Sequence, residues 1–154
     1  MLALQGFRTH PLGADQTCQF SRARARLATD GLLAISTFGD QTFRELRHAF
    51  GLAYAASGLA AVEHVVPMRS AEDWRRDFPD AEIVEQTVLK VFPDVKAFLR
   101  SVQEAGAVNA LSGRRFLSRC VLRKMIECYT AQYGAPEPGG IVATYHIIYV
   151  YCAA

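Results

Sequence analysis

A strand that runs through a loop into a helix is the feature that most constrains the fold of this chain. The stretch GLLAISTFGDQTFRELRHAF begins at Gly31, and its apolar run predicts a strand over 32–37. A helix is predicted over 41–56, because apolar residues recur on one side of it at Phe43, Leu46, Ala49 and Phe50. A strand leading into a helix is typical of α/β proteins, in which such units come in series.

Two further strands are predicted, over 82–92 and 141–152. The last one carries apolar or aromatic residues on both faces: Ile141, Tyr145, Ile147 and Tyr149 on one, and Val142, Ile148 and Val150 on the other. A strand of this kind is typical of a sheet that is covered on both sides. The predicted fold class is therefore α/β.

Four more helices complete the pattern. One is predicted over 15–28, and a short one is opened by Ser70, with Asp73 completing a capping-box variant. Pro93 is predicted as the first residue of the next helix, which stops at Gly106. The longest is predicted over 113–133, with an inner side made of Leu117, Cys120, Val121, Met125 and Cys128.

Composition excludes several classes of protein. The 154 residues leave room for one domain with a core, and the net charge of +2 gives no reason to expect nucleic acid. No apolar run approaches the ~20 residues of a membrane span, and no secretory signal is recognisable at the start. The four cysteines lack CxxC spacing, so we expect no metal site and reduced, mostly buried thiols in a cytoplasmic protein.

Three motifs resemble one family of enzymes. LLAISTFGDQTFRELRHAF is similar to malonyl-acyl-carrier-protein O-methyltransferases of biotin synthesis, in which the fifth strand ends in Ser-Thr-Phe/Leu-Gly and a helix with Glu-Leu-Arg follows. GAVNALSGR at 106–114 resembles that family's Gly-Ala-Thr-Asn…Gly-Arg stretch, and ATYHIIY at 143–149 resembles its terminal strand. The motifs occur in the family's order, and the resemblance covers about residues 28–152.

This resemblance implies the C-terminal half of a class I, Rossmann-like methyltransferase sheet. In that fold the seventh strand runs antiparallel between the fifth and the sixth. The predicted strands 32–37, 82–92 and 141–152 would be the fifth, sixth and seventh, with flanking helices. The region 31–154 would be the C-terminal methyltransferase region, with a helical insertion at about 93–133.

The region 1–30 resembles the family only in part. Leu2-Ala3-Leu4-Gln5 is similar to the family's Asn-Leu-Ala-Leu-Gln-Trp after the fourth strand, which makes Leu4 and Gln5 the candidates for cofactor contact. Residues 6–26 do not match, so region 1–30 is read as a degenerate loop and helix; a frame-shifted or decayed coding segment would explain this.

The family uses S-adenosylmethionine. Its glycine-rich turn and its ribose-binding acid belong to an N-terminal half that we expect to be absent, so we expect the chain alone not to bind this cofactor.

The resemblance also suggests substrate-binding residues. Arg47 could hold the malonyl carboxylate through a bidentate fork, although a surface ion pair with Glu45 or its neighbours is an open alternative. Asn109 and Arg114 could line the acyl entrance, although Asn109 could equally stabilise a turn. No catalytic residue is predicted, because a carboxylate is already ionised near neutral pH and needs no base; His146 is expected to be a packed strand histidine.

A run of cations follows on the longest helix. Arg115, Arg119, Arg123 and Lys124, together with Arg114, could steer an acidic acyl-carrier protein to a docking surface. The alternative is a solvated helix face, which is also how we interpret Arg22, Arg24 and Arg26.

Two functions of different classes stay open. The first is a partial S-adenosylmethionine-dependent methyltransferase acting on malonyl-acyl-carrier protein. The second is a non-catalytic truncated remnant, or a carrier-protein-binding or oligomerising module. The strand 32–37 is expected to leave an unpaired edge, with the stripe of Phe43, Leu46 and Phe50 exposed. We therefore expect self-association or a partner that carries the first half, and we expect no membrane and no nucleic acid as partners.

Overall fold

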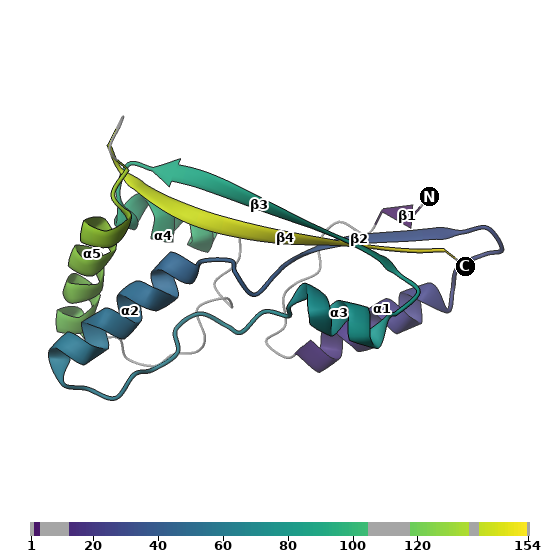
Figure 1. Cartoon of the computed structure of the whole chain (residues 1–154), viewed down its shortest axis with the longest axis horizontal. Coiled ribbons are helices and arrows are strands. Elements are labelled where there is room, and N and C mark those ends of the chain that lie inside the picture. The colour runs from purple at the N-terminus through teal and green to yellow at the C-terminus, as the bar shows by residue number, and fades with distance from the viewer. Residues whose placement is uncertain (1, 4–12, 105–117, 136–138, 154) are drawn as a thin grey trace. The chain divides into compact units, whose positions relative to one another are not determined.

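A computed structural model describes residues 2–3, 13–104, 118–135 and 139–153 of the chain. In chain order, the elements in these ranges are β1 (Leu2–Ala3), α1 (Gly13–Arg24), β2 (Leu32–Phe38), α2 (Arg44–Ser57), α3 (Ala71–Asp77), β3 (Glu82–Phe92), α4 (Val95–Glu104), α5 (Arg119–Tyr133) and β4 (Ile141–Ala153) (Figure 1). The α/β class predicted from the sequence is confirmed.

The strands form one sheet in the order β1-β2-β4-β3. β1 pairs with β2 in parallel, with Leu2 opposite Leu33. β4 pairs with β2 in the antiparallel sense, from Leu32 opposite Ala153 to Phe38 opposite Ile147. The last strand of the chain therefore lies between the two strands that precede it, as the sequence predicted.

The predicted strands agree with the observed ones to within one residue at each end. The prediction for Pro93 was wrong, because α4 begins two residues later, at Val95. The Asp94 carboxylate explains this start: its Oδ1 accepts a hydrogen bond from the Ala97 N–H at 2.7 Å, which satisfies a free donor of the first helical turn. At Ser70, by contrast, both bonds of the predicted capping box are present.

The longest helix starts later than predicted, and its inner side agrees with the prediction at Val121 and Met125 but not at the cysteines. Ser118 is the N-cap residue of α5, and its side chain accepts a hydrogen bond from the Cys120 N–H. The buried residues are Val121, Met125 and Tyr129, which recur at intervals of four. Cys120 is exposed and Cys128 is half-buried, so both were wrongly placed, while Gly113 and Leu117 lie outside the described residues.

The described chain forms two compact units. The first comprises Met1–Thr42, Pro67–Val88 and Tyr145–Ala154, and the second comprises Phe43–Val66 and Leu89–Thr144. In the first unit α1 and α3 lie side by side (Figure 1), and Phe20 packs edge-on against Phe78 with ring centroids 4.4 Å apart. These rings, with Trp74, join apolar residues of β2 and β4 in one buried cluster.

The second unit is built on α2 and α5, which lie side by side (Figure 1). Phe98 of α4 lies at its centre, with ring centroids 5.2 to 6.0 Å from those of Phe43, Phe92 and Tyr129. Phe43, Leu46 and Phe50 are all buried here, so the predicted exposure of this stripe was wrong. The neighbouring helices of the same unit supply the apolar partners that α2 needs.

A buried carboxylate fixes the start of α2 to β4. Glu45 is only 4% exposed, and its side chain accepts hydrogen bonds from the backbone N–H and the hydroxyl of Thr144. The Phe43 N–H donates to the Thr144 carbonyl oxygen at 2.9 Å. Since a buried carboxylate is costly unless its oxygens are satisfied, these bonds explain why Glu45 is tolerated there.

The inner strand β4 and the outer strand β3 differ in how far their side chains are covered. In β4, residues from Thr144 to Cys152 alternate between buried and half-buried, so both faces are covered, as predicted. In β3, which lies at the end of the strand order, Val84, Val88, Leu89 and Val91 are exposed by 38 to 62%. Self-association through a strand edge stays a prediction, and among the described strands β3 carries most of the exposed large apolar side chains, with Leu32 of β2 also exposed.

The prediction of mostly buried thiols was wrong. All four are free thiols, but Cys18 and Cys120 are exposed, Cys128 is half-buried and only Cys152 is buried. Burial raises the pKa of the Cys152 thiol. None of the helices in the described ranges is long and apolar enough to cross a membrane.

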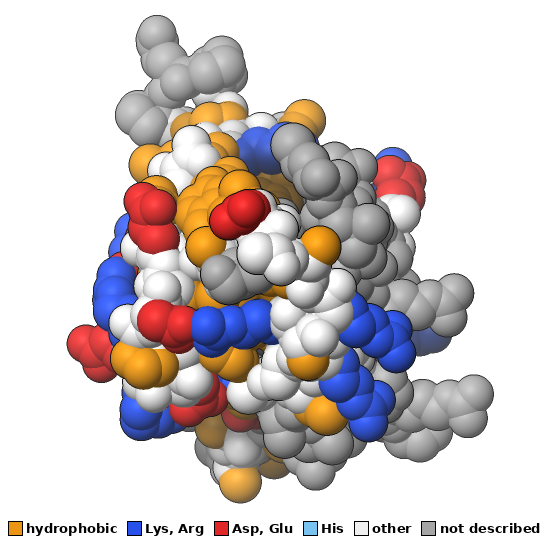
Figure 2. Space-filling view, turned by 90° about the vertical axis from the view of Figure 1, so that its right-hand side faces the viewer, with side chains coloured by type: hydrophobic (Ala, Val, Ile, Leu, Met, Phe, Trp, Pro, Cys, Tyr) orange, Lys and Arg blue, Asp and Glu red, His pale blue; other side chains and the backbone are white. Residues whose placement is uncertain are grey.

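Charges on the surface are mixed in sign. Figure 2 shows acidic and basic side chains interspersed on one face of the molecule. In the first unit, Arg24 pairs with Asp80, Arg69 with Asp77 and Arg75 with Glu85. Arg24 is therefore an ion-pair partner as well as a surface cation. Its guanidinium holds the pKa of the Asp80 carboxyl below its usual value.

Candidate functional site

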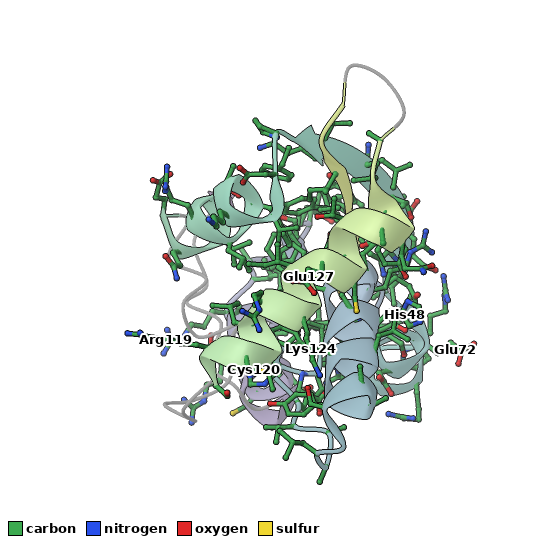
Figure 3. The ribbon with its side chains drawn as sticks, turned by 90° about the vertical axis from the view of Figure 1, so that its left-hand side faces the viewer. His48, Glu72, Arg119, Cys120, Lys124 and Glu127 are labelled. Carbon is green, nitrogen blue, oxygen red and sulfur yellow. The ribbon has the colours of Figure 1, made fainter. Side chains whose placement is uncertain are left out.

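The cations of α5 do not form a single cluster. Lys124 lies on the side of α5 that faces α2 (Figure 3), and its Nζ donates a hydrogen bond to the Ala56 carbonyl oxygen at 2.7 Å. It thereby satisfies a free carbonyl of the last turn of α2. Arg123 lies 3.9 Å from Glu127 one turn further along, and Arg119 is exposed at the start of the helix (Figure 3).

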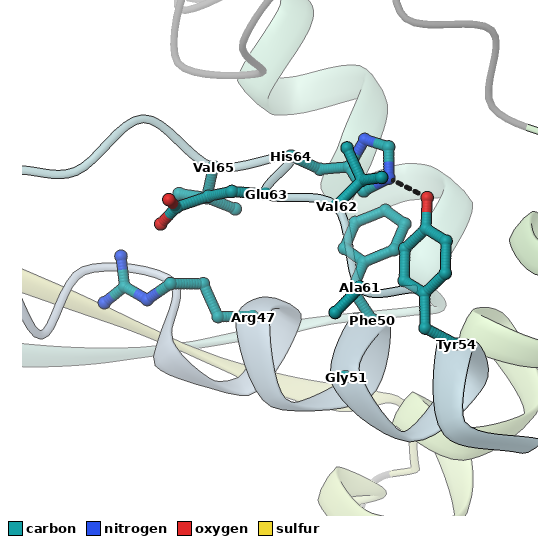
Figure 4. A pocket seen from close by; sticks show the side chains of 9 residues that line it. All are labelled: Arg47, Phe50, Gly51, Tyr54, Ala61, Val62, Glu63, His64 and Val65. Atoms are coloured by element: carbon teal, nitrogen blue, oxygen red, sulfur yellow. Dashed lines mark hydrogen bonds between the residues drawn. The ribbon is translucent and has the colours of Figure 1, made fainter. Parts of the chain in front are cut away.

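Arg47 lines a cavity of about 280 Å³ in the second unit. One wall of this cavity is the face of α2 that carries Arg47, Phe50, Gly51 and Tyr54, and the other is the segment 61–65 (Figure 4). These helix residues are spaced by three, four and seven positions, which places them on one face. The segment 61–65 has no periodic pattern in the sequence, so its part in a cavity wall was not predicted.

One end of the cavity is aromatic. The Phe50 and His64 ring centroids are 4.3 Å apart, and the Tyr54 ring stacks on His64 at an interplanar angle of 8°. The Tyr54 hydroxyl and His64 Nε2 are joined by a hydrogen bond of 2.6 Å. Stacking and the hydrogen bond together fix the imidazole, so this end is a rigid, largely apolar wall.

The other end of the cavity is charged. Figure 4 shows the Arg47 guanidinium and the Glu63 carboxylate at this end, away from the rings. A guanidinium has five N–H donors, so Arg47 can serve a protein partner and a ligand carboxylate together. This end of the cavity therefore carries both signs of charge, and Arg47 is its donor for an anionic group.

Five of the other predicted site residues cannot be placed relative to this cavity. Leu4, Gln5, Asn109, Arg114 and Arg115 lie outside the described residues.

A second polar cluster surrounds His146 in the first unit. The imidazole is 5% exposed, and its Nε2 lies 3.2 Å from Glu85 Oε2. Its Nδ1 lies 3.4 Å from Asp40 Oδ1, which is ion-pair range without hydrogen-bond geometry. The prediction of a packed strand histidine is confirmed. Its carboxylate partners were missed, since no local spacing links residues so far apart in the sequence.

The backbone of His146 is also hydrogen-bonded within the chain. The Thr42 hydroxyl donates to the His146 carbonyl oxygen at 2.8 Å, and the His146 N–H donates to the Thr42 Oγ1 at 3.0 Å. A side chain on Gly39 would place its Cβ 2.3 Å from His146 Nδ1. Gly39 is therefore a glycine because the imidazole occupies the space of its side chain.

The glycines next to strands do not fit a cofactor cradle. The space beside Gly39, which follows β2, is filled by His146, and a Cβ on Gly140, which precedes β4, would lie 2.2 Å from the Phe92 carbonyl oxygen. Neither leaves backbone open to a nucleotide-like ligand. These two glycines therefore do not fit the close approach of backbone to S-adenosylmethionine, and within the described residues no group of three metal-ligating side chains occurs.

Comparison with known proteins identifies relatives. The chain is similar to "Malonyl-[acyl-carrier protein] O-methyltransferase" of Geobacter sulfurreducens, with 37% identity in an alignment of length 146 that covers 84% of this chain and 51% of the relative. The proteins of the same name from Brevibacillus brevis and Halalkalibacterium halodurans are 36% and 33% identical, over 84% and 87% of this chain and 48% and 50% of the relative. No protein family model matches. The chain spans about half the length of the curated relatives that it matches, and the resemblance inferred from the motifs is confirmed.

Proposed function

Because this chain is homologous to malonyl-[acyl-carrier protein] O-methyltransferases over about half of their length, we propose that it forms the substrate-binding part of such an enzyme. The reaction of the family converts the free carboxylate of a malonyl thioester into its methyl ester. Arg47 at the charged end of the cavity is the observation that carries the proposal.

The sheet supports the assignment to the C-terminal half of the methyltransferase fold. β2, β4 and β3 would be the fifth, seventh and sixth strands, and their order in the sheet fits that numbering. The antiparallel pairing of β4 with β2 fits a seventh strand beside a fifth. On this proposal, the region of α4 and α5 is the family's helical insertion after the sixth strand.

The proposed role of Arg47 is to bind and orient the malonyl carboxylate. A guanidinium can hold both oxygens of a carboxylate in a fork, which fixes the direction in which a methyl group can approach. No general base is required, because the carboxylate is ionised near neutral pH. S-adenosylmethionine supplies the methyl group in the family, and we assign none of the described residues to it.

Arg119 and Arg123 are the described candidates for docking the carrier protein. Both are exposed on α5, and an acyl-carrier protein is acidic, so long-range attraction would speed the encounter. Lys124 is assigned to packing instead, because its ammonium group binds the end of α2.

The proposal is tested by titrating the purified chain with malonyl-acyl-carrier protein and with acetyl-acyl-carrier protein, which lacks the carboxylate. We expect the malonyl form to bind about tenfold more tightly or better, since a charged hydrogen bond contributes about 1.5–3 kcal/mol. Arg47→Ala should remove that preference and leave acetyl binding unchanged, as measured by calorimetry.

Arg44→Ala is the matched control, because Arg44 is an exposed arginine of the same helix that does not line the cavity. It should keep the preference for malonyl. Added salt should weaken both carrier proteins alike if docking depends on exposed cations. Equal binding of the malonyl and acetyl forms by the unmodified chain would refute the proposed role of Arg47.

A further inference from the structure

Gly51 stands in the middle of α2, where glycine is a poor choice. The helix runs from Arg44 to Ser57, and its glycine C-cap, Gly58, has the positive φ that favours this residue. Gly51 is not among the residues with positive φ. A glycine inside a helix costs stability relative to alanine, so its presence needs a reason other than backbone conformation.

Packing does not supply that reason. A Cβ built on Gly51 has no atom within 4 Å in the part of the chain that the structure describes. Gly39, by contrast, has no room for a Cβ. Gly51 is instead exposed on the wall of the cavity, four residues after Arg47 and three before Tyr54.

We infer that Gly51 is a specificity-determining residue, which leaves room for the acyl chain of a short carboxylate-terminated thioester whose carboxylate binds Arg47. This inference rests on the proposed function and adds a residue and a length limit to it. The helical rise places Gly51 about 6 Å and Tyr54 about 10 Å along the axis from Arg47. A carboxylate held by Arg47 therefore directs its chain across the bare backbone of Gly51 toward the rings.

The aromatic rings limit the length of the acyl chain. Phe50, Tyr54 and His64 are held together by stacking and by the Tyr54–His64 hydrogen bond, so they cannot easily move away from a longer chain. A cavity of about 280 Å³ has room for an acyl chain of a few carbon atoms. Because Gly51 is exposed, the thioester and its carrier arm can leave the cavity past this residue.

The test uses N-acetylcysteamine thioesters of acetate, malonate and glutarate, titrated into the full chain and into Gly51→Ala and Gly51→Leu. A displaced methyl group in a pocket changes affinity about tenfold or more. Gly51→Ala should weaken all three thioesters at least about tenfold, glutaryl most strongly, while it raises the melting temperature because alanine favours helix. Gly51→Leu should abolish binding.

Ala55→Leu is the control, since it adds bulk at an exposed position of α2 that does not line the cavity. It should leave all affinities unchanged. A lower melting temperature for Gly51→Ala would make this glycine structural and overturn the inference. Unchanged affinities in both Gly51 variants would overturn it as well, and so would an absence of thioester binding by the unmodified chain.

The two proposals fail in different ways. Loss of the role proposed for Arg47 appears as equal affinity for the malonyl and acetyl thioesters. The role of Gly51 is judged by the common loss of all thioesters in its variants. Equal malonyl and acetyl affinities together with that common loss would therefore refute the role of Arg47 and leave only the part of the inference that makes Gly51 a residue beside the acyl chain.

Discussion

Two histidines lie in opposite surroundings in this chain. His146, in the first unit, is buried between the carboxylates of Asp40 and Glu85, and it occupies the space that a side chain on Gly39 would need. His64, in the second unit, is half-buried and forms part of a cavity wall, with Gly51 across an open space.

The contrast separates residues that serve the fold from residues that are available to a ligand. The backbone N–H and carbonyl oxygen of His146 both have hydrogen-bond partners within the chain, in Thr42 and Gly39. Around His64 the polar groups line a space that no described atom fills. Gly39, which protein atoms crowd, is explained by packing, whereas Gly51 lies beside an open cavity and is the glycine for which we propose a role in ligand binding.

The largest expected effect is a loss of stability at the packed site around His146. In Gly39→Ala the new Cβ would lie 2.3 Å from His146 Nδ1 and 2.8 Å from Ile148 Cδ1. Overpacking of this kind costs about 1–3 kcal/mol, and we expect the upper part of this range because the imidazole is held on several sides. Urea unfolding measures the loss.

Two further variants make this prediction decisive. The double variant Gly39→Ala with His146→Ala should lose less than the sum of its parts, because removal of the imidazole makes room for the methyl group. Gly51→Ala should change stability in the opposite direction. A neutral Gly39→Ala would mean that β2 and His146 separate easily, and the contrast between the two sites would disappear.

The sequence predicted the strands well because their signal is local. The apolar runs of β2, β3 and β4 are bounded by glycine and proline, and both the runs and their limits can be read without knowing the neighbours. The start of α5 was less predictable. The stretch before Ser118 contains no strong helix breaker after Gly113, so the pattern alone suggested a longer helix.

The candidate site was only partly predictable. Arg47 was singled out from a motif, but its cavity depends on segment 61–65, which has no periodic pattern. The Glu45–Thr144 and His146–Glu85 contacts join residues 99 and 61 positions apart. Contacts over such separations are set by strand order and register, which single-residue spacing does not encode.

An intermediate effect concerns the capping box of α3, in the same unit as His146. Hydrogen bonds from the Ser70 backbone N–H and hydroxyl hold the pKa of the Asp73 carboxyl below its ordinary value of 3.8. A lowered pKa stabilises the folded state above the unfolded pKa, and this contribution is lost as the pH falls through the folded pKa. Ser70→Ala should cost about 1 kcal/mol near neutral pH and less below about pH 4.

Ser57→Ala in the second unit is the control for the capping box. The Ser57 hydroxyl donates to the Ala53 carbonyl oxygen within its own helix and caps no N-terminus. Its loss should stay within about 0.5 kcal/mol and show no acid dependence. Thermal unfolding between pH 3 and 7 measures both variants, and an equal loss at all pH values for Ser70→Ala would contradict the role of Asp73.

The smallest expected effect leaves stability unchanged and compares the two histidines by their chemistry. Diethyl pyrocarbonate modifies accessible imidazoles, and peptide mass spectrometry gives the rate for each one. His146 should react at least about tenfold more slowly than exposed His48, because its modification requires local opening of the first unit. His64 should react at an intermediate rate, since the Tyr54 hydroxyl occupies its Nε2.

Tyr54→Phe removes that hydrogen bond, so it should accelerate the modification of His64 and leave the His146 rate unchanged. Equal rates for His64 and His146 in the unmodified chain would mean that the cavity is closed in solution, and the room attributed to Gly51 would then not be available to a ligand.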